Sequence, residues 1–500
     1  MGKQLGRELP SPTSLSPRAV SLAFAAATTG TLMVNVDATI VNVALPLMQR
    51  SFGLPLATLQ WAATAYLLVI TGVLPLTEQL AAWVGRRRML VIGVGAFTLG
   101  SVLAALAPDF PLLLASRVVQ GLGGAVIQAN VMAIVALIFP QSERGRALGM
   151  IGAVVAAGSL AGPSLGGFLT AFFSWRSVFW VNLPIGVWGT WAVSRYLPLF
   201  PRDTALRLTR LDWPGAAMFF LLTATLQLAL ASLTTTLGAY LVLATAVLLV
   251  IFLAFERSHA HPVVRLHLFR RGTFSRNLLS GIAWSVLMMF PAFLLPFYLR
   301  GVLREPMWLV GLSLVPQALG NFFVSPLGGR IADRHGVLLP GRLGFLLYLL
   351  ADLALALPQR APLWEIWIFA AATGVASGLI MAPNNSAILN SVPSAETGLA
   401  SAMIATQRNL GRNVGVALAA LAPTIYWAAI GAGSPSIASP AYPQLFLGAF
   451  RAAFLVVPVF ALVGIALLSP PKPPLSQVAE AATGAGHESA IGADRNGSPR

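Results

Sequence analysis

Residues 236–255 read TLGAYLVLATAVLLVIFLAF, twenty consecutive residues without an acidic or basic side chain. A helix that crosses a bilayer needs about 20 apolar residues, so this stretch predicts a transmembrane helix. The whole chain has this character, because 57% of its 500 residues are hydrophobic and only 10% are charged. The apolar runs lack the alternation of a membrane barrel, and helices are then the structure that can pair the backbone in lipid. We therefore expect an all-α polytopic membrane protein.

Fourteen apolar runs along the chain are long enough to be spans. The predicted spans lie near residues 20–46, 57–81, 88–107, 111–138, 146–172, 176–197, 213–232, 236–255, 275–299, 307–329, 338–358, 364–388, 397–428 and 447–468. The tail beyond them is rich in Pro, Ala, Gly and Ser, a composition typical of disorder.

The basic residues predict the topology. The net charge is +16, but the Lys and Arg residues stand in short clusters between apolar runs, which argues against nucleic-acid binding. With both termini inside, the cytoplasmic segments hold 23 of the 32 basic residues and the outer loops five, the asymmetry expected of cytoplasmic loops. Residues 1–19 lack the features of a secretory signal, so the first span is expected to act as its own insertion signal.

Two loop segments form an internal repeat. Residues 78–85 read EQLAAWVG and residues 329–336 read GRIADRHG, and each follows a span that runs from outside to inside. The two units lie eight spans apart, which fits two six-span halves and a two-span insert, an organisation found in transporters. A chance likeness of two basic loops is the alternative. The predicted gating residues here are Glu78, Gly85, Arg86, Gly329, Asp333, Arg334 and Gly336.

Several kinds of chemistry are excluded by residues that the chain lacks. Its only lysines, Lys3 and Lys472, follow no Gly-rich loop of Walker type, and no HExxH zinc motif or cysteine occurs. The histidines all fall outside the predicted spans, so no metal or haem site can be built from them inside the membrane. We therefore expect no cofactor, no metal and no enzymatic activity, and transport driven by an ion gradient remains.

Two acidic residues lie clearly within predicted spans, Asp37 and Asp352, with Glu78 at the inner end of a third. Charged groups inside a membrane are expensive and are functional by default. Asp37 is the first choice for a proton-coupling residue, with a structural role as the alternative. Asp352 stands in a plain apolar context and could face a cavity or the outer surface, while Glu78 fits a gate better than a proton site.

Three of the four arginines inside predicted spans also need an explanation. A lone buried cation requires a partner, and Asp37 is a candidate partner for Arg117 by charge alone. Arg117 is therefore a third predicted proton-coupling residue. Arg408 and Arg412 share one helix face at i, i+4, where they could line a cavity or extend towards the inner surface.

The span near 146–172 is rich in small residues. Gly158 and Gly162, four residues apart, permit close helix approach, and Pro163 interrupts the backbone hydrogen bonds and favours a kink. We expect a helix that packs tightly and can bend, although packing alone would explain the glycines. All three residues are predicted to contribute to gating.

A drug-like ligand needs an apolar, aromatic cavity with a few polar anchors. Asn384 and Asn385, beside Pro383, are favoured because adjacent amides within a span require partners. For the aromatic residues, lipid contact or packing is an equal alternative. The predicted substrate-binding residues are Trp61, Tyr66, Asn130, Phe290, Asn384 and Asn385.

At these motifs the chain resembles the 14-span drug:proton antiporter branch of the major facilitator superfamily. The likeness rests on the motifs DATIVNVALP at 37–46, RVVQGLG at 117–123, the glycine-rich 158–167, WRSVFWVNLPIG at 175–186 and LDWPG at 211–215. It implies roles in proton coupling for Asp37 and in proton transfer for Arg117. It also implies a monomer.

One departure concerns the gating loop after the second span. The family's loop usually carries an Asp that helps to latch the inner gate, and here Ala82 takes its place while Glu78 replaces the first Gly and Trp83 the first Arg. The second copy keeps Gly329, Asp333, Arg334 and Gly336. Either Glu78 supplies the missing charge, or the outward-open state is held less tightly.

The sequence thus predicts a multi-pass protein of a bacterial inner membrane with both termini cytoplasmic. We expect it to export amphipathic, drug-like molecules in exchange for protons by alternating access. A transporter of one metabolite and a non-transporting sensor are the alternatives. The expected organisation is a cytoplasmic segment 1–19, a six-helix bundle 20–197, an inserted pair 198–255, a second bundle 256–468 and a tail 469–500.

Overall fold

The computed structural model describes residues 16–139, 143–200, 212–259, 264–393 and 396–470, and its regular structure there is entirely helical. Most of the predicted terminal segments 1–19 and 469–500 lie outside these ranges. The first helices are α1 (Pro17–Phe52), α2 (Leu56–Leu59), α3 (Trp61–Val84), α4 (Arg86–Leu106), α5 (Phe110–Ile138), α6 (Arg144–Phe172), α7 (Ser177–Trp180) and α8 (Asn182–Tyr196).

The second part of the chain begins with a helix pair and continues with a second bundle. Its helices are α9 (Trp213–Ala231), α10 (Thr236–Ser258), η3 (Leu266–Arg270), α11 (Gly272–Phe297), η4 (Tyr298–Val302), α12 (Met307–Ser313), α13 (Val315–His335), α14 (Leu338–Ala356), α15 (Leu363–Leu389), α16 (Thr397–Ala429), α17 (Tyr442–Val456) and α18 (Val459–Leu467).

Within the described residues, twelve helical segments are long and apolar enough to cross a membrane, so the expected count of fourteen is not supported. The predicted spans near 176–197 and 397–428 are the two that are missing. The first is interrupted between α7 and α8, which leaves α8 only 15 residues long. The second, α16, has 33 residues, but polar side chains such as Arg408 and Arg412 lower its mean hydropathy.

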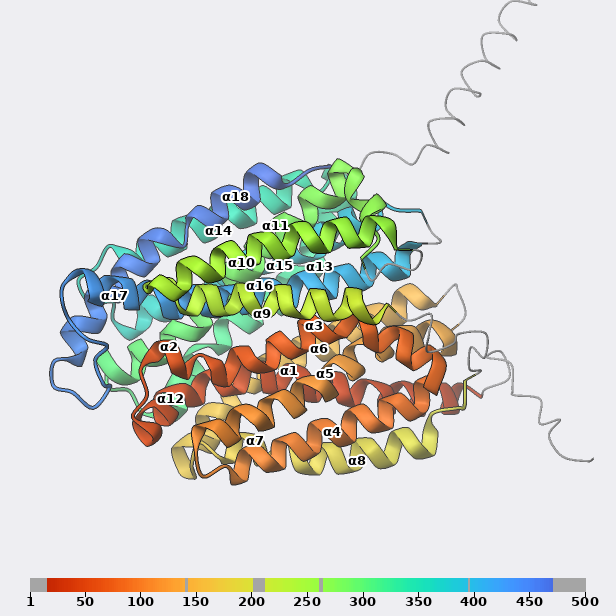
Figure 1. The fold of residues 1–500 in the computed structure, drawn as a ribbon, viewed down its shortest axis with the longest axis horizontal. Coiled ribbons are helices and arrows are strands. Elements are labelled where there is room, and N and C mark those ends of the chain that lie inside the picture. The colour runs from red at the N-terminus through yellow and green to blue at the C-terminus, as the bar shows by residue number, and fades with distance from the viewer. Residues whose placement is uncertain (1–15, 140–142, 201–211, 260–263, 394–395, 471–500) are drawn as a thin grey trace, which may run out of the picture.

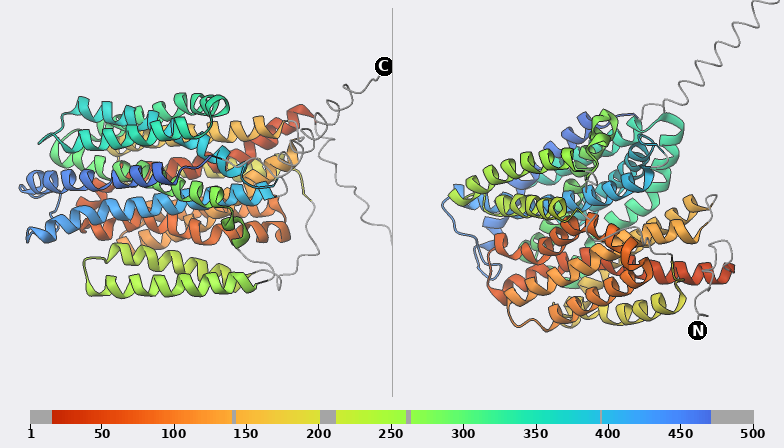
Figure 2. Two further views of the ribbon diagram at one scale, coloured as in Figure 1. Left: turned by 90° about the horizontal axis from the view of Figure 1, so that it is seen from above. Right: turned by 45° about the vertical axis from the view of Figure 1, so that its right-hand side comes forward.

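The helices form two groups that lie side by side. Helices α1 to α8 make up the red-to-yellow group of Figure 1, and α11 to α18 make up the green-to-blue group. The pair α9 and α10 lies against one side of the molecule, as the left view of Figure 2 shows. Helix α9 packs against α3 of the first group and α16 of the second, while α10 packs on α9. The inserted pair therefore covers the seam between α3 and α16.

A large apolar core joins the two groups directly at one end, whereas at the other a small cluster around Ala216 and Phe252 of the inserted pair contacts both Leu76 of α3 and Met403 of α16. Both the start of α1 and the end of α18 lie at the same end of the molecule (Figure 1), which we call the terminal end. At the opposite end one continuous core includes Val36–Met48 of α1 and Trp284–Phe297 of α11. At the terminal end each group has its own core, one around Ala23–Val34 and the other around Phe274 and Leu278. The ribbons also diverge towards this end in the right view of Figure 2.

Candidate ion-coupling site

Asp37 and Arg117 form an ion pair in the interior of the first group. Asp37 comes from α1 and Arg117 from α5, and the Arg117 Nη1 atom lies 2.6 Å from Asp37 Oδ2. The two side chains are 0% and 1% exposed. The structure thus brings together two residues that the sequence related only by charge.

Neutral amides complete the surroundings of the Asp37 carboxylate. Its Oδ1 atom accepts hydrogen bonds from Gln120 Nε2 and from Asn182 Nδ2, both at 3.2 Å. Gln120 Nε2 also donates to Ser101 Oγ at 2.7 Å. Four helices, α1, α4, α5 and α8, therefore contribute to one polar network around the carboxylate.

Arg117 connects this network to its surroundings. Its Nε donates to the Ala62 carbonyl oxygen at 2.8 Å, and its Nη1 also donates to Gln120 Oε1 at 2.6 Å. The guanidinium carbon lies 4.4 Å from the centre of the Tyr66 ring and 5.7 Å from that of Phe179, within range of cation–π attraction. Arg117 thus links α1 and α5 to two residues of α3.

A buried ion pair of this kind makes the fold sensitive to protonation. Removing the charge of one partner leaves the other charge buried and uncompensated, which costs about 3–5 kcal/mol. The Asp37 carboxylate also accepts hydrogen bonds that are strong only while it is ionised. A proton on Asp37 would therefore change the contacts of Arg117.

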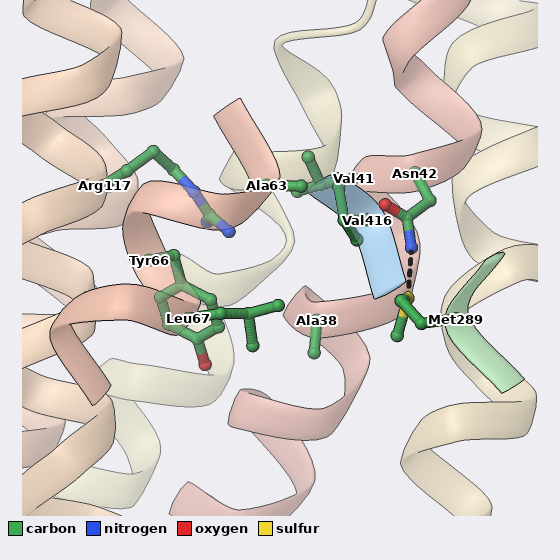
Figure 3. A pocket seen from close by; sticks show the side chains of 9 residues that line it. All are labelled: Ala38, Val41, Asn42, Ala63, Tyr66, Leu67, Arg117, Met289 and Val416. Carbon is green, nitrogen blue, oxygen red and sulfur yellow. Dashed lines mark hydrogen bonds between the residues drawn. The ribbon is translucent and has the colours of Figure 1, made fainter. Parts of the chain in front are cut away.

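A small cavity lies beside this pair, where the two groups meet (Figure 3). Tyr66 and Arg117 line it from the first group, and Met289 and Val416 from the second. At the same place Asn42 Nδ2 donates to Met289 Sδ at 3.6 Å. The space that these side chains leave between them is too small to hold a water molecule, far below the roughly 300–1,000 Å³ of ligand pockets. It marks the seam rather than a formed drug-sized pocket.

Helix α16 presents a set of polar side chains to this interior. Asn409 Nδ2 donates across the seam to Gln128 Oε1 of α5 at 3.0 Å. Arg412 is 8% exposed and its Nε has no hydrogen-bond partner among the described residues, whereas Arg408 is half-buried. The sequence left open whether these arginines line a cavity or extend towards the surface, and the structure buries Arg412.

The glycines of α6 mediate close packing. Side-chain atoms added to Gly158 and Gly162 would meet the backbone of α1 at Leu32 and Val36. Pro163 lies inside α6, and its carbonyl oxygen faces Gly311 of α12 in the second group. The predicted motif therefore lies between α1 and a helix of the other group.

The two repeated loop segments have the same backbone feature. Gly85 ends α3 with φ of 100° and Gly336 ends α13 with φ of 78°, a conformation that glycine adopts without strain. Arg86 follows as the first residue of α4, and the neighbouring Arg87 donates a hydrogen bond to the Ser194 carbonyl oxygen of α8.

The expected latch residues are not joined in this conformation. Asp333 and Arg334 are exposed, and neither forms an ion pair with another described residue. A methyl group added at Gly329 of α13 would lie within ordinary contact distance of Ala382. Glu78 falls within α3, but its side chain lies outside the described part of the structure, so its compensating role stays a prediction.

Asp352 is buried but stands apart from the ion pair. It lies in α14, is 1% exposed, and neither carboxyl oxygen has a hydrogen-bond partner among the described residues. Helix α14 packs against α13, α15, α17 and α18, all within the second group. The side chain is therefore enclosed by protein, about one turn before α14 ends at Ala356, and the choice between a cavity-facing position and one near the outer surface stays open.

The expected substrate-binding residues are dispersed. Tyr66 lines the cavity, but Trp61 packs against the joint apolar core, and Phe290 lies in that core with its ring 5.7 Å from Phe454. Asn130 Nδ2 donates to its own helix at Val126. Asn384 is buried with an unpartnered Oδ1, whereas the adjacent Asn385 is half-buried.

Three members of the Asp37 network were not among the predicted site residues. Gln120 lies in the motif RVVQGLG and Asn182 in WVNLP, so both were part of motifs that the sequence singles out. Ser101, in α4, carries no such signal. Their roles depend on which helix faces turn towards Asp37, and no pattern within one helix specifies this.

The fold and this site define a polytopic helical membrane transporter. The chain belongs to the Major Facilitator Superfamily, whose family model matches residues 27–416 and 277–493. The family and its transporter relatives identify a transporter rather than an enzyme.

The similar proteins include transporters of different substrates. The riboflavin transporter RibZ of Clostridioides difficile is 30% identical over 78% of this chain and 85% of its own length. The multidrug resistance protein Stp of Mycobacterium tuberculosis is 30% identical over 78% of this chain and 73% of its own. Drug efflux and the transport of a specific metabolite are both consistent with these relatives.

A solved structure supports the fold. A bacterial homologue of the human lysosomal transporter Spinster, in an inward-facing and occupied conformation, superimposes with a TM-score of 0.68 at 15% identity. The match covers 91% of this chain and 97% of that one. At this identity the likeness concerns the fold alone.

Proposed function

We propose that this protein exports amphipathic small molecules in exchange for protons by alternating access. The observation that carries the proposal is the buried ion pair between Asp37 and Arg117, with Arg117 at the wall of the cavity between the two groups. Asp37 lies inside the first group, and Arg117 connects it to the seam of the two groups, so the pair can sense protons and substrate together.

In the proposed mechanism, protonation of Asp37 releases Arg117. The guanidinium then keeps its contacts with Gln120, the Ala62 carbonyl oxygen and the Tyr66 ring, and these contacts become the stronger constraint on its position. Tyr66 lines the cavity, so a proton at α1 alters the surface that a substrate meets. Such a change shifts the equilibrium between inward-open and outward-open states.

The shared core at the opposite end and the separate cores at the terminal end fit one half of this cycle. We propose that this conformation is open towards the cytoplasm, with both termini on that side of a bacterial inner membrane. We further propose that the protein acts as a monomer.

The remaining predicted residues have proposed roles in this cycle. The loop segments at Gly85 and Gly336 would form the cytoplasmic gate, and the glycines of α6 would allow the two groups to slide. Asp352, unpartnered in the second group, would be a second protonation site.

A transporter of one specific metabolite is the second candidate. It is favoured by the riboflavin transporter among the relatives, whose identity to this chain equals that of the multidrug resistance protein. A panel of unrelated substrates separates the two functions, because a metabolite transporter accepts one compound class only.

The test uses inside-out vesicles with an acidic interior. Amphipathic compounds are added outside, and the release of protons from the lumen is followed with a pH-sensitive dye. We expect substrate-dependent release in the wild type and its loss in Asp37→Asn, because the amide carries no titratable proton. Release that persists in the variant would remove Asp37 from the coupling path.

Asp109→Asn is the matched control. Asp109 is exposed and caps the N-terminus of α5, the helix that carries Arg117, with its Oδ1 accepting from Leu112 N at 2.9 Å. Asparagine caps helices about as well as aspartate. This variant makes the same chemical change outside the membrane interior and should exchange like the wild type.

A further inference from the structure

Arg408 and Arg412 of α16 have no counter-charge among the side chains that the structure describes. Neither forms a hydrogen bond or an ion pair with any described residue. Arg412 is also buried, with an exposed fraction of 8%. They stand four residues apart, so the two positive charges repel each other along one helix face. Two unpaired cations in a membrane interior are costly and call for an external partner.

The two arginines lead to the cavity between the groups. Val416, one helical turn beyond Arg412 on the same face, lines that cavity. Arg412 is also within electrostatic range of Tyr66, another lining residue. Positions 408, 412 and 416 therefore lie on one face of α16. We call Arg408 and Arg412 the basic column, and it leads to the cavity wall at Val416.

The two interior acids whose side chains the structure describes, Asp37 and Asp352, do not pair with this column. Asp37 is held by Arg117, Gln120 and Asn182 within the first group. Asp352 lies in α14, a helix packed against other members of the second group. Among the described side chains, a lipophilic cation would find no free carboxylate on this face, whereas an anion would find two free guanidinium groups.

Amide groups beside the column supply further recognition. An added methyl group at Gly281 would meet both the side chain of Gln407 and that of Asn384, so these two amides converge there. Oxygen atoms of Gln407, Asn384 and Asn413 are buried without hydrogen-bond partners among the described residues. These oxygen atoms are hydrogen-bond acceptors, so they would bind a hydroxyl or N–H donor on the ligand's skeleton and not its acidic group.

We propose that the substrate carries an acidic group, a carboxylate or sulfonate on an apolar skeleton, and that Arg412 and Arg408 bind this group. The proposal rests on the proposed transport function and names its substrate class. Guanidinium groups bind carboxylates in bidentate geometry, which gives orientation as well as attraction. Tyr66 and the apolar cavity wall would contact the skeleton.

A soluble anion fits better than a lipid headgroup. Helix α9 packs against both α3 and α16 and so covers the seam beside the column from the lipid side (Figure 2). The two main cores at the terminal end are separate, which leaves room for an approach from that end.

The test measures binding to the purified full chain in nanodiscs of phosphatidylcholine, without a proton gradient. The probes are 2-naphthoate, 2-naphthalenemethanol and 2-naphthylmethylammonium, which share one skeleton and differ in charge. We expect naphthoate to bind at least about tenfold more tightly than the other two. Arg412→Gln should abolish this preference, and Arg412→Lys should retain part of it because a lysine keeps the charge without the bidentate geometry.

Stability and a control variant complete the test. Arg412→Gln should raise the melting temperature of the ligand-free protein, because it removes an unpaired buried charge, whereas an arginine with a structural partner would lower it. Arg50→Gln removes an exposed arginine at the opposite end and should change neither binding nor stability. The binding of naphthoate is measured without a proton gradient, so it does not depend on proton coupling. The proposed proton exchange can therefore fail while the proposed anion site holds, and the reverse.

Three results would overturn the proposal. They are absent or charge-independent binding of naphthoate, a preference for the ammonium probe, and an anion preference that survives Arg412→Gln. Nanodiscs with added phosphatidylglycerol test the lipid source. Naphthoate affinity should not change there, and competition by the anionic lipid would make its headgroup the occupant instead.

Discussion

Gly167 of α6 and Gly311 of α12 lie back to back, with their backbones in contact across the two helix groups. A methyl group added to Gly167 would lie 2.8 Å from the Gly311 Cα atom, and one added to Gly311 would lie 2.7 Å from the Gly167 Cα atom. Neither backbone can yield without the helices moving apart. The contact therefore depends on both residues lacking a side chain.

Gly167→Ala is expected to weaken the closure of the two groups at the opposite end. Overpacking of this kind typically costs about 1–3 kcal/mol, and 1.4 kcal/mol shifts an equilibrium about tenfold. The chain has no cysteine, so spin labels at Arg50→Cys and Trp308→Cys report the distance between α1 and α12 directly. The population with a longer distance should grow.

Gly95→Ala is the control for this experiment. Gly95 lies in α4, and an added methyl group there would have no atom within 4 Å. The label distances should match those of the wild type. Unchanged distances in Gly167→Ala as well would show that the glycine contact does not hold this end closed.

Replacing one member of the Asp37–Arg117 pair should cost more than replacing both. Asp37→Leu or Arg117→Leu leaves one buried charge without its partner, which is expected to destabilise the protein by about 3–5 kcal/mol. The double variant removes both charges and should recover most of that loss, but not proton exchange. Thermal unfolding of the purified variants measures the coupling. Additive losses would contradict a direct interaction.

Asn182→Leu is expected to destabilise the anionic form of the site. Its side chain donates to Asp37 Oδ1 at 3.2 Å, and a hydrogen bond to a charged group contributes about 1.5–3 kcal/mol. The variant should melt at a lower temperature and exchange protons more slowly. Asn130→Leu is the control, because the Asn130 amide donates only to the Val126 carbonyl oxygen of its own helix. Its melting temperature and its rate of proton exchange should change less. Equal effects would assign no special role to Asn182.

Linking α5 to α16 should stop the transport cycle. Gln128 and Asn409 hydrogen-bond across the seam at 3.0 Å, so Gln128→Cys and Asn409→Cys can be joined by a short, cleavable bifunctional reagent. Alternating access requires the groups to move, so exchange should fall to background and recover after cleavage. Ser313→Cys with Trp367→Cys joins two positions of one group and should leave exchange intact. Full activity in the linked seam would argue against rocking at this contact.

Sequence patterns were sufficient for the membrane class and for most span positions, because hydrophobicity acts on each helix separately. Asp37 and Arg117 could be selected for the same reason, since a charge inside an apolar run is costly wherever the helix packs. The expected count of fourteen spans failed at α8 and α16. Hydrophobicity averaged over a span-length stretch does not reveal the break between α7 and α8. It also does not reveal how the polar side chains of α16 are placed.

The sequence by itself determined that this protein is a helical membrane protein with few charges, and which charges are expensive. Only the tertiary structure decided their partners: Arg117 meets Asp37, Gln120 and Asn182 join them, and Arg412 meets no acid among the described residues. The physical reason is that burial depends on local hydrophobicity, whereas pairing depends on how helices distant in sequence rotate and pack. That packing is set by close contacts such as Gly167 with Gly311, which no single helix encodes.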